Sequence, residues 1–97
     1  MVERIRKRDG SIKEFCPEKI TNAIFKAAMA CGGDDYELAR HLCEQVVALI
    51  EEQFSGRIPD VESIQDLVER TLIKNGHAKT AKAYILYREK RTGARNA

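Results

Sequence analysis

Glycines divide most of this chain into four segments of helical spacing. Gly32-Gly33, Gly56 and Asn75-Gly76 each follow a run in which apolar residues recur every three or four positions, the spacing of one face of an α-helix. Glycine and asparagine also adopt the left-handed backbone that ends many helices. The pattern therefore predicts four helices, each presenting one apolar face to a shared core.

The start of each segment carries a residue that is typical of helix N-termini. Proline suits the first helical turn because its missing N–H would have no partner there, and aspartate caps free backbone amides. The candidate starts are Pro17, Asp34 or Asp35, Asp60, and His77 or Ala78. The apolar pattern of the last segment ends near Arg91.

Short strands precede the helices. Arg4-Ile5-Arg6 and Ile12-Lys13-Glu14-Phe15 alternate apolar and charged residues on either side of Asp9-Gly10, a pair that favours a tight hairpin turn. Arg57-Ile58-Pro59 can add a short third strand at the edge, since Pro59 has no amide hydrogen to donate. The predicted fold class is α+β, a four-helix bundle capped by a small two- to three-stranded β-sheet made of the N-terminal hairpin plus a short edge strand.

The size and charge of the chain exclude several classes of protein. Its 97 residues suit one domain with a single core. Since 17 Lys and Arg face 15 Asp and Glu, the net charge of +2 argues against nucleic-acid binding by bulk electrostatics. No apolar run reaches the length of a membrane span and the first residues lack the apolar segment of a signal peptide, so we expect a cytoplasmic location and no membrane partner.

The sequence offers little for catalysis or metal binding. It lacks the GxSxG, HExxH and Walker A patterns, so no catalytic residue is assigned. Cys16, Cys31 and Cys43 form no close pair and the two histidines lie far apart, so neither a disulfide framework nor a metal site is expected. We therefore expect that this domain alone is not an enzyme.

Positive charge is concentrated at two places far apart in the sequence. Lys7 and Arg8 precede the hairpin glycine, and Arg88 and Arg91 lie one helical turn apart near the other end. Lys19 falls in the first turn of the first helix, where backbone amides also favour anions. These five cations would form an anion site if the last helix returned beside the hairpin. Spacing alone leaves open that each cluster is a solvent-exposed face without a ligand.

Four motifs, in order along the chain, resemble the ATP-cone, a regulatory nucleotide-binding domain of many ribonucleotide reductases and of the bacterial repressor of their genes. The motifs are Ile5-Arg6-Lys7-Arg8-Asp9-Gly10, Phe15 with Glu18-Lys19-Ile20, Ile64-Gln65-Asp66-Leu67-Val68-Glu69, and Ala83-Tyr84-Ile85-Leu86-Tyr87-Arg88 with Arg91. The resemblance covers residues 2–91. It implies a four-helix bundle covered by a three-stranded sheet.

The resemblance also implies an adenine nucleotide site. The expected phosphate ligands are Lys7, Arg8, Lys19, Arg88 and Arg91, with Lys13 approaching from the second strand. The side chains expected to enclose the adenine are Ile5, Phe15, Ile20 and Tyr87. Cys16 and Val61 fall where some relatives carry polar groups that read the base or the sugar.

As a member of this family, the chain would be an allosteric domain that binds ATP or dATP, with or without Mg2+, and controls the activity and oligomerisation of a ribonucleotide reductase. Residues 1–91 would form the cone, and residues 92–97 a linker or the truncated start of a catalytic domain in cis. The expected partners are adenine nucleotides, that catalytic domain and further copies of the chain.

The resemblance favours an anaerobic or cobalamin-dependent reductase, acting on ribonucleoside triphosphates or diphosphates. The repressor branch carries a zinc ribbon before the cone, and no such set of cysteines is present here. The alternatives left open are the nucleotide-sensing part of a transcriptional repressor, a helical protein–protein interaction domain without nucleotide binding, and a small nucleic-acid binder.

Overall fold

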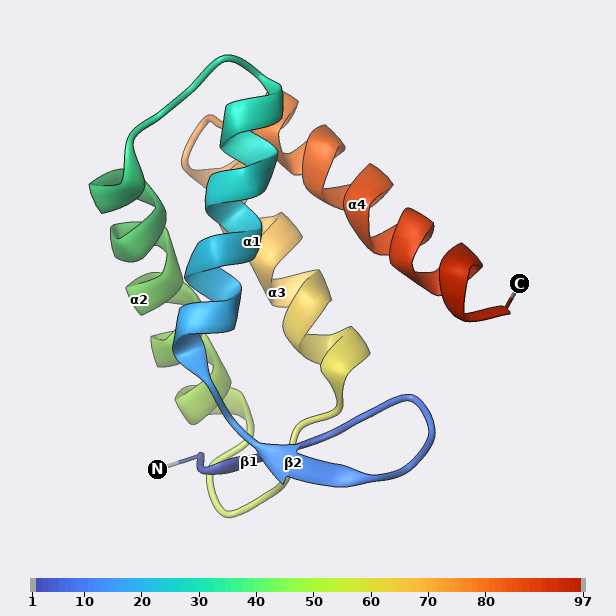
Figure 1. The fold of residues 1–97 in the computed structure, drawn as a ribbon. Helices are drawn as coiled ribbons and strands as arrows, with labels where there is room; N and C mark the ends of the chain where they lie inside the picture. Colours follow the sequence, from blue (N-terminus) through green and yellow to red (C-terminus); the bar gives the residue numbers. More distant parts are fainter. Residues whose placement is uncertain (1, 97) are drawn as a thin grey trace.

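A β-hairpin precedes four helices in the computed structural model, which describes the backbone of residues 2–96 and the side chains of residues 2–89. The hairpin consists of β1 (Arg4–Arg6) and β2 (Ile12–Glu14). The helices that follow are α1 (Pro17–Ala30), α2 (Tyr36–Gln53), α3 (Val61–Lys74) and α4 (Ala78–Asn96). Figure 1 shows the hairpin at one end of the helical bundle. The predicted α+β fold is confirmed.

The hairpin is antiparallel, as predicted, and its register places Ile5 opposite Lys13. Gly10 has φ of 88°, in the left-handed region that a side chain disfavours, so the Asp-Gly prediction of the turn is confirmed. The expected third strand is reduced to a single parallel bridge between Arg6 and Asp60, and the described residues form a two-stranded sheet. Pairing with β1 stops after one bridge because Pro59 cannot donate to a ladder and the chain enters α3 directly after Asp60.

The helices begin where the sequence predicts. Asp35, rather than Asp34, caps α2, because its Oδ1 accepts a hydrogen bond from the backbone N–H of Leu38 at 3.0 Å. Asp60 caps α3 in the same way, accepting from the N–H of Ser63 at 3.2 Å. Pro17 occupies the first turn of α1.

The core lies between the helices and is closed at one end by the hairpin. Its most deeply buried helical side chains come from α1, α2 and α3, and they are Ile24, Val46, Ile50, Val68 and Leu72. The last helix contributes Ala81 and Tyr84. Helix α1 packs against both α2 and α4, and α3 packs against the same two helices. In this arrangement α4 runs back towards the hairpin. The basic cluster of α4 can meet the basic cluster of the hairpin turn only if the helix runs in this direction.

Helix α4 continues to Asn96, beyond Arg91 where the apolar pattern of the sequence stops. The side chain of Arg91 lies outside the part of the chain that the structure describes. The division at residues 91 and 92 between cone and linker therefore stays a prediction. Within the described residues, no helix combines the length and apolar character needed to cross a membrane.

Candidate functional site

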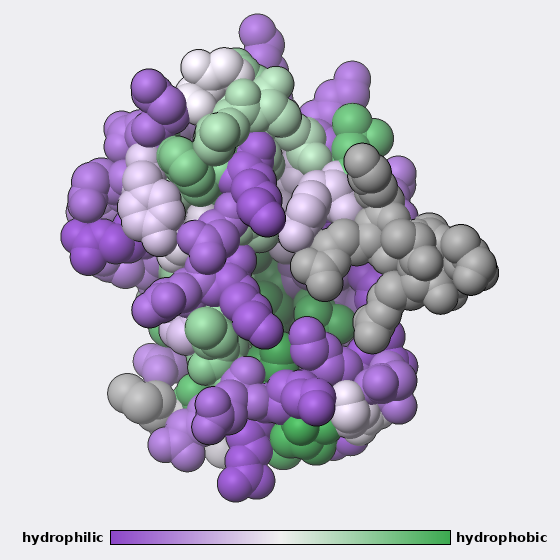
Figure 2. All heavy atoms as spheres, in the orientation of Figure 1, coloured by the Kyte–Doolittle hydropathy of each residue, from purple (hydrophilic) through white to green (hydrophobic). Residues whose placement is uncertain are grey.

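A cavity of about 680 Å3 lies where the hairpin meets the helices, and we call it the hairpin cavity. Its walls come from both strands and the turn, the first turns of α1 and α3, and the middle of α4. The lining residues are Ile5, Lys7, Arg8, Lys13, Glu14, Phe15, Cys16, Lys19, Ile20, Ala23, Val61, Ile64, Gln65, Tyr84 and Tyr87. On the face drawn in Figure 2, hydrophilic residues surround hydrophobic surface visible above the hairpin.

Most residues predicted from the sequence as site residues line this one cavity. The ten that do so are Ile5, Lys7, Arg8, Lys13, Phe15, Cys16, Lys19, Ile20, Val61 and Tyr87. They come from five elements and two connections, and they fall in three separate parts of the sequence: residues 5–20, Val61 and Tyr87. Folding therefore brings together side chains from different motifs. Sequence spacing relates residues within a motif, but it does not show which motifs meet in space.

One wall of the hairpin cavity is apolar and aromatic. Ile20 and Tyr84 are buried, and Phe15 packs against the hydrophobic core. The rings of Tyr84 and Tyr87 lie with their centroids 6.5 Å apart and their planes tilted by 35°. A wall of this kind suits a flat, weakly polar ligand group such as an aromatic base.

Another part of the lining is cationic. Lys19 lies in the first turn of α1, where the unpaired backbone amides of a helix favour anions. Lys13 reaches the cavity from β2, and Lys7 and Arg8 reach it from the turn. Within residues 2–89, neither Lys13 nor Lys19 has an ion-pair partner. These two ammonium groups are therefore available to an anion that enters the cavity.

Arg8 is held against α3. Its Nη2 donates a hydrogen bond of 3.1 Å to Oε1 of Gln65, and its Nε lies 3.7 Å from Oε1 of Glu62. Its side chain is 25% exposed. Gln65 thus positions the guanidinium in the lining of the hairpin cavity.

Arg88 does not line the hairpin cavity, although the sequence analysis predicted that it would share one anion site with the other cations. It lines a smaller, neighbouring cavity of about 450 Å3, the arginine cavity, with Arg8, Glu62, Glu69, Ile85 and Glu89. Its Nη1 donates to Oδ1 of Asp66 at 3.1 Å and also to Oε1 of Glu69. Burial alone would lower the pKa of Arg88, but the hydrogen bonds that it donates to Glu69 and Asp66, and the negative charges of these carboxylates, outweigh burial and raise it.

Sequence reasoning missed five residues that line the hairpin cavity: Glu14, Ala23, Ile64, Gln65 and Tyr84. Two helical spacings point to some of them. Gln65 lies one turn after the predicted Val61, and Tyr84 one turn before the predicted Tyr87, so each shares a helix face with a residue already assigned. Nothing in the sequence signalled that Asp66 and Glu69 hold Arg88.

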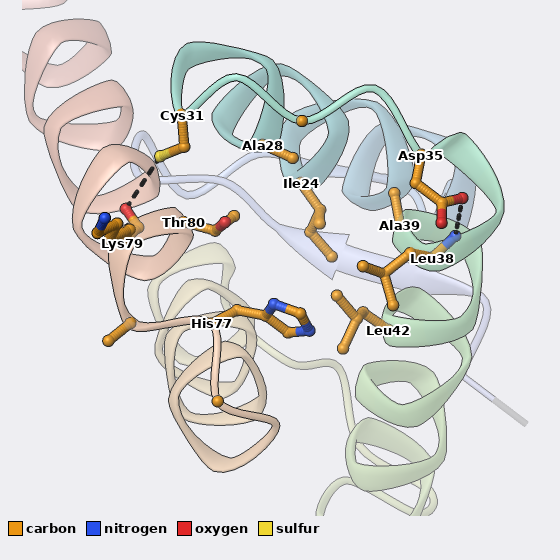
Figure 3. Close-up of a pocket in the computed structure, with 13 residues that line it drawn as sticks. Ile24, Ala28, Cys31, Asp35, Leu38, Ala39, Leu42, His77, Lys79 and Thr80 are labelled. Atoms are coloured by element: carbon orange, nitrogen blue, oxygen red, sulfur yellow. Dashed lines mark hydrogen bonds between the residues drawn. The ribbon is translucent and has the colours of Figure 1, made fainter.

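A further cavity of about 530 Å3 lies at the opposite end of the bundle, between the ends of α1 and the starts of α2 and α4. Figure 3 shows Ile24, Ala28 and Leu42 facing it, with His77 pointing inward from the turn before α4. The thiol of Cys31 donates to the carbonyl oxygen of Lys79 at 3.3 Å across its rim. None of the predicted site residues lines it.

The fold and the hairpin cavity together define a small α+β domain whose pocket has one cationic and one aromatic wall. The profile of the ATP cone domain family matches residues 3–93 of the chain. The chain therefore belongs to the ATP-cone family, and the resemblance seen in its four motifs is confirmed.

Its relatives include three kinds of ribonucleotide reductase. The chain is 40% identical to the vitamin B12-dependent ribonucleoside-diphosphate reductase of Thermoplasma acidophilum, over 98% of this chain and 13% of that protein. It is 38% identical to the anaerobic ribonucleoside-triphosphate reductase of Escherichia coli, over 94% of this chain and 12% of that protein. It is 42% identical to the ribonucleoside-diphosphate reductase subunit alpha of Chlamydia muridarum, over 93% of this chain and 10% of that protein. The chain thus spans a small part of the relatives that it matches.

Proposed function

We propose that this chain is the regulatory domain of a ribonucleotide reductase and binds ATP or dATP in the hairpin cavity. The observation that carries the proposal is the convergence of ten predicted ligand residues on that one cavity. The cavity offers a flat apolar wall and a cluster of cations, which are the two features that an adenine nucleotide requires.

In the proposed complex, the adenine lies against the apolar wall, between Ile5, Phe15, Ile20 and Tyr87. Cys16 and Val61 face the base or the sugar. The phosphates extend towards the cations of the turn and of α1, which are Lys7, Arg8, Lys13 and Lys19. The last phosphate passes Arg8 and enters the arginine cavity, where Arg88 is its ligand, with Arg91 further along α4.

The energetics of such a site are sufficient for a cellular nucleotide. A hydrogen bond to a charged group contributes about 1.5 to 3 kcal/mol. Three or four of them, together with a stacked base, account for the roughly 8 kcal/mol of a micromolar dissociation constant. Mg2+ bound to the triphosphate would reduce its net charge without needing a metal ligand from the protein.

Regulation follows if the nucleotide favours one assembly of the reductase over another. A ligand shifts such an equilibrium only by its differential affinity for the two states. The nucleotide joins the hairpin, α1 and α4, so its binding changes the surface presented to a catalytic domain in cis or to another copy of the chain. We place this activity in the cytoplasm, with the chemistry of reduction in the rest of the protein.

Calorimetric titration of the 97-residue chain with ATP, dATP and GTP tests the proposal. We expect saturable binding of ATP and dATP and weaker binding of GTP. Lys19→Ala should weaken ATP binding roughly tenfold, the loss of about one charge-assisted hydrogen bond. Lys26→Ala, which removes an exposed lysine of the same helix outside the cavity, is the matched control and should leave the affinity unchanged.

Absence of both binding heat and a thermal shift with all three nucleotides would contradict the proposal. The helical interaction domain without nucleotide binding would then be the better interpretation. That alternative predicts self-association that rises with protein concentration and ignores nucleotides, which sedimentation of the same samples would detect.

A further inference from the structure

Two arginines of the proposed phosphate site, Arg8 and Arg88, already have partners on α3. Arg8 contacts Gln65 and Glu62, and Arg88 contacts Asp66 and Glu69. Helix α3 therefore presents a row of carboxylates and one amide to the same two guanidinium groups that a triphosphate would need. Carboxylate and phosphate oxygens compete for the same guanidinium donors.

The contacts of Arg88 are partly shielded from water. Its side chain is 18% exposed and that of Glu69 is 21% exposed, whereas that of Asp66 is 63% exposed. Shielding strengthens the attraction between opposite charges, so Glu69 holds Arg88 more firmly than Asp66 does. The arginine cavity adjoins the hairpin cavity at Arg8, which lines both.

We propose that Asp66 and Glu69 form a carboxylate latch that holds Arg88 in the nucleotide-free domain and competes with the triphosphate for it. The inference rests on the proposed function, because it concerns the affinity and the regulation of the same site. Nucleotide binding is then an exchange of partners. The terminal phosphate takes the guanidinium of Arg88, and the two carboxylates return to water.

The exchange has a structural consequence beyond affinity. The latch is an ionic connection between α3 and α4, which the bound phosphate replaces with a connection from α4 to the nucleotide. Occupancy of the pocket thereby changes how α4 is held, and α4 is the helix that leads out of the cone. Asp66 and Glu69, which no prediction assigned to the site, become the residues that set how much nucleotide is needed for this change.

The opposite role for the carboxylates makes the opposite prediction. If Asp66 and Glu69 only position Arg88 for the phosphate, neutralising them would misplace the guanidinium and weaken nucleotide binding. If they act as a latch, neutralising them removes a competitor and strengthens binding. The sign of the change in affinity therefore separates the two roles.

The test is calorimetric titration of the chain with ATP for the wild type, Glu69→Gln and Asp66→Asn. We expect Glu69→Gln to bind ATP roughly tenfold more tightly and Asp66→Asn about threefold, as the more exposed contact is the weaker competitor. Glu52→Gln is the matched control. It removes the same charge from an exposed position near the end of α2, outside the three cavities, and should change the affinity less than twofold.

A second pair of variants shows that the gain passes through Arg88. Glu69→Gln should give no improvement when it is added to Arg88→Ala, since no guanidinium remains to be released. Circular dichroism establishes that each variant is folded. If Glu69→Gln does not fold, Asp66→Asn still tests the latch, because Asp66 is at an exposed position. Unchanged or weaker ATP binding by the folded carboxylate variants, or an equal gain in Glu52→Gln, would overturn the latch while leaving nucleotide binding in place. A wild type that binds no nucleotide would instead remove the proposed function itself.

Discussion

The backbone N–H of Arg6 donates a hydrogen bond of 2.9 Å to the carbonyl oxygen of Pro59. This bond fastens the end of β1 to the residue before Asp60, the cap of α3. The cationic turn of the hairpin and the first turn of α3 are therefore held as one unit. Two walls of the hairpin cavity depend on this connection, so the start of α3 affects both stability and the shape of the pocket.

Asp60→Ala should lower the free energy of unfolding by about 1 kcal/mol, the usual cost of losing a helix cap. The carboxylate of Asp60 accepts hydrogen bonds from the backbone N–H of Ser63 at 3.2 Å and from its hydroxyl at 2.7 Å. Urea denaturation measures the change. Asp34→Ala is the control, because Asp34 is an exposed aspartate before α2 and the cap of that helix is Asp35. Equal stability losses in the two variants would contradict the role of Asp60.

The stabilisation from Asp60 should also depend on pH. The side-chain hydrogen bond from Ser63 is the main cause that lowers the pKa of Asp60, so the folded state prefers the ionised carboxylate. The contribution is therefore fully present above the usual pKa of an aspartate and is lost as the pH falls through the lower, folded value. The difference in unfolding free energy between wild type and Asp60→Asn should stay constant from pH 7 to about pH 5 and shrink below about pH 4. A difference that stays constant down to about pH 2 would contradict the assignment.

Gly10→Ala should destabilise the hairpin by about 1 to 2 kcal/mol, because φ at Gly10 is 88° and a side chain is strained there. An added Cβ would meet no atom within 4 Å, so the cost comes from the backbone alone. Gly10→Asn should lose less stability, since asparagine tolerates the left-handed region. Thermal unfolding of the three proteins measures the series, and similar stability for Ala and Asn would show that the turn relaxes.

The sequence predicted the elements well because each boundary depends on local chemistry. Asp35, Asp60 and Asn75-Gly76 act on backbone groups within a few residues, and the structure has helix ends at these positions. The third strand was harder to predict. Whether Arg57-Ile58-Pro59 forms a ladder depends on its pairing with a distant β1, and only one bridge forms.

Site prediction had a similar limit. A family motif identifies which residues line a pocket, and ten of them do line the hairpin cavity. The partners of Arg88 depend on the packing of α3 against α4, where Asp66 and Glu69 reach across from another helix. Contacts between side chains 19 and 22 positions apart leave no spacing signal in a single sequence.

Nucleotide binding should protect one of the three cysteines from alkylation. Cys16 lines the hairpin cavity, whereas Cys31 is exposed at the other end of the bundle. Iodoacetamide should therefore modify both thiols in the free chain, and ATP should slow modification of Cys16 alone. Cys43 is an internal reference for unfolding, because burial raises the pKa of its thiol and keeps it unreactive in the folded state. Mass spectrometry of the peptides reports all three rates, and equal protection of Cys16 and Cys31 would argue against a ligand in the hairpin cavity.

Thr71→Val should stabilise the fold by about 1 kcal/mol, an uncommon result for a buried position. Thr71 is 3% exposed, and among the described residues its Oγ1 is buried without a hydrogen-bond partner. Valine has nearly the same shape and removes a polar group whose desolvation is not compensated. Thr21→Val is the matched control: Thr21 is 4% exposed, but its Oγ1 donates to the carbonyl oxygen of Pro17 at 3.5 Å, so the same substitution should destabilise. Denaturation of both variants at pH 7 measures the contrast, and a loss of stability in Thr71→Val equal to that in Thr21→Val would mean that a buried water satisfies the Thr71 hydroxyl.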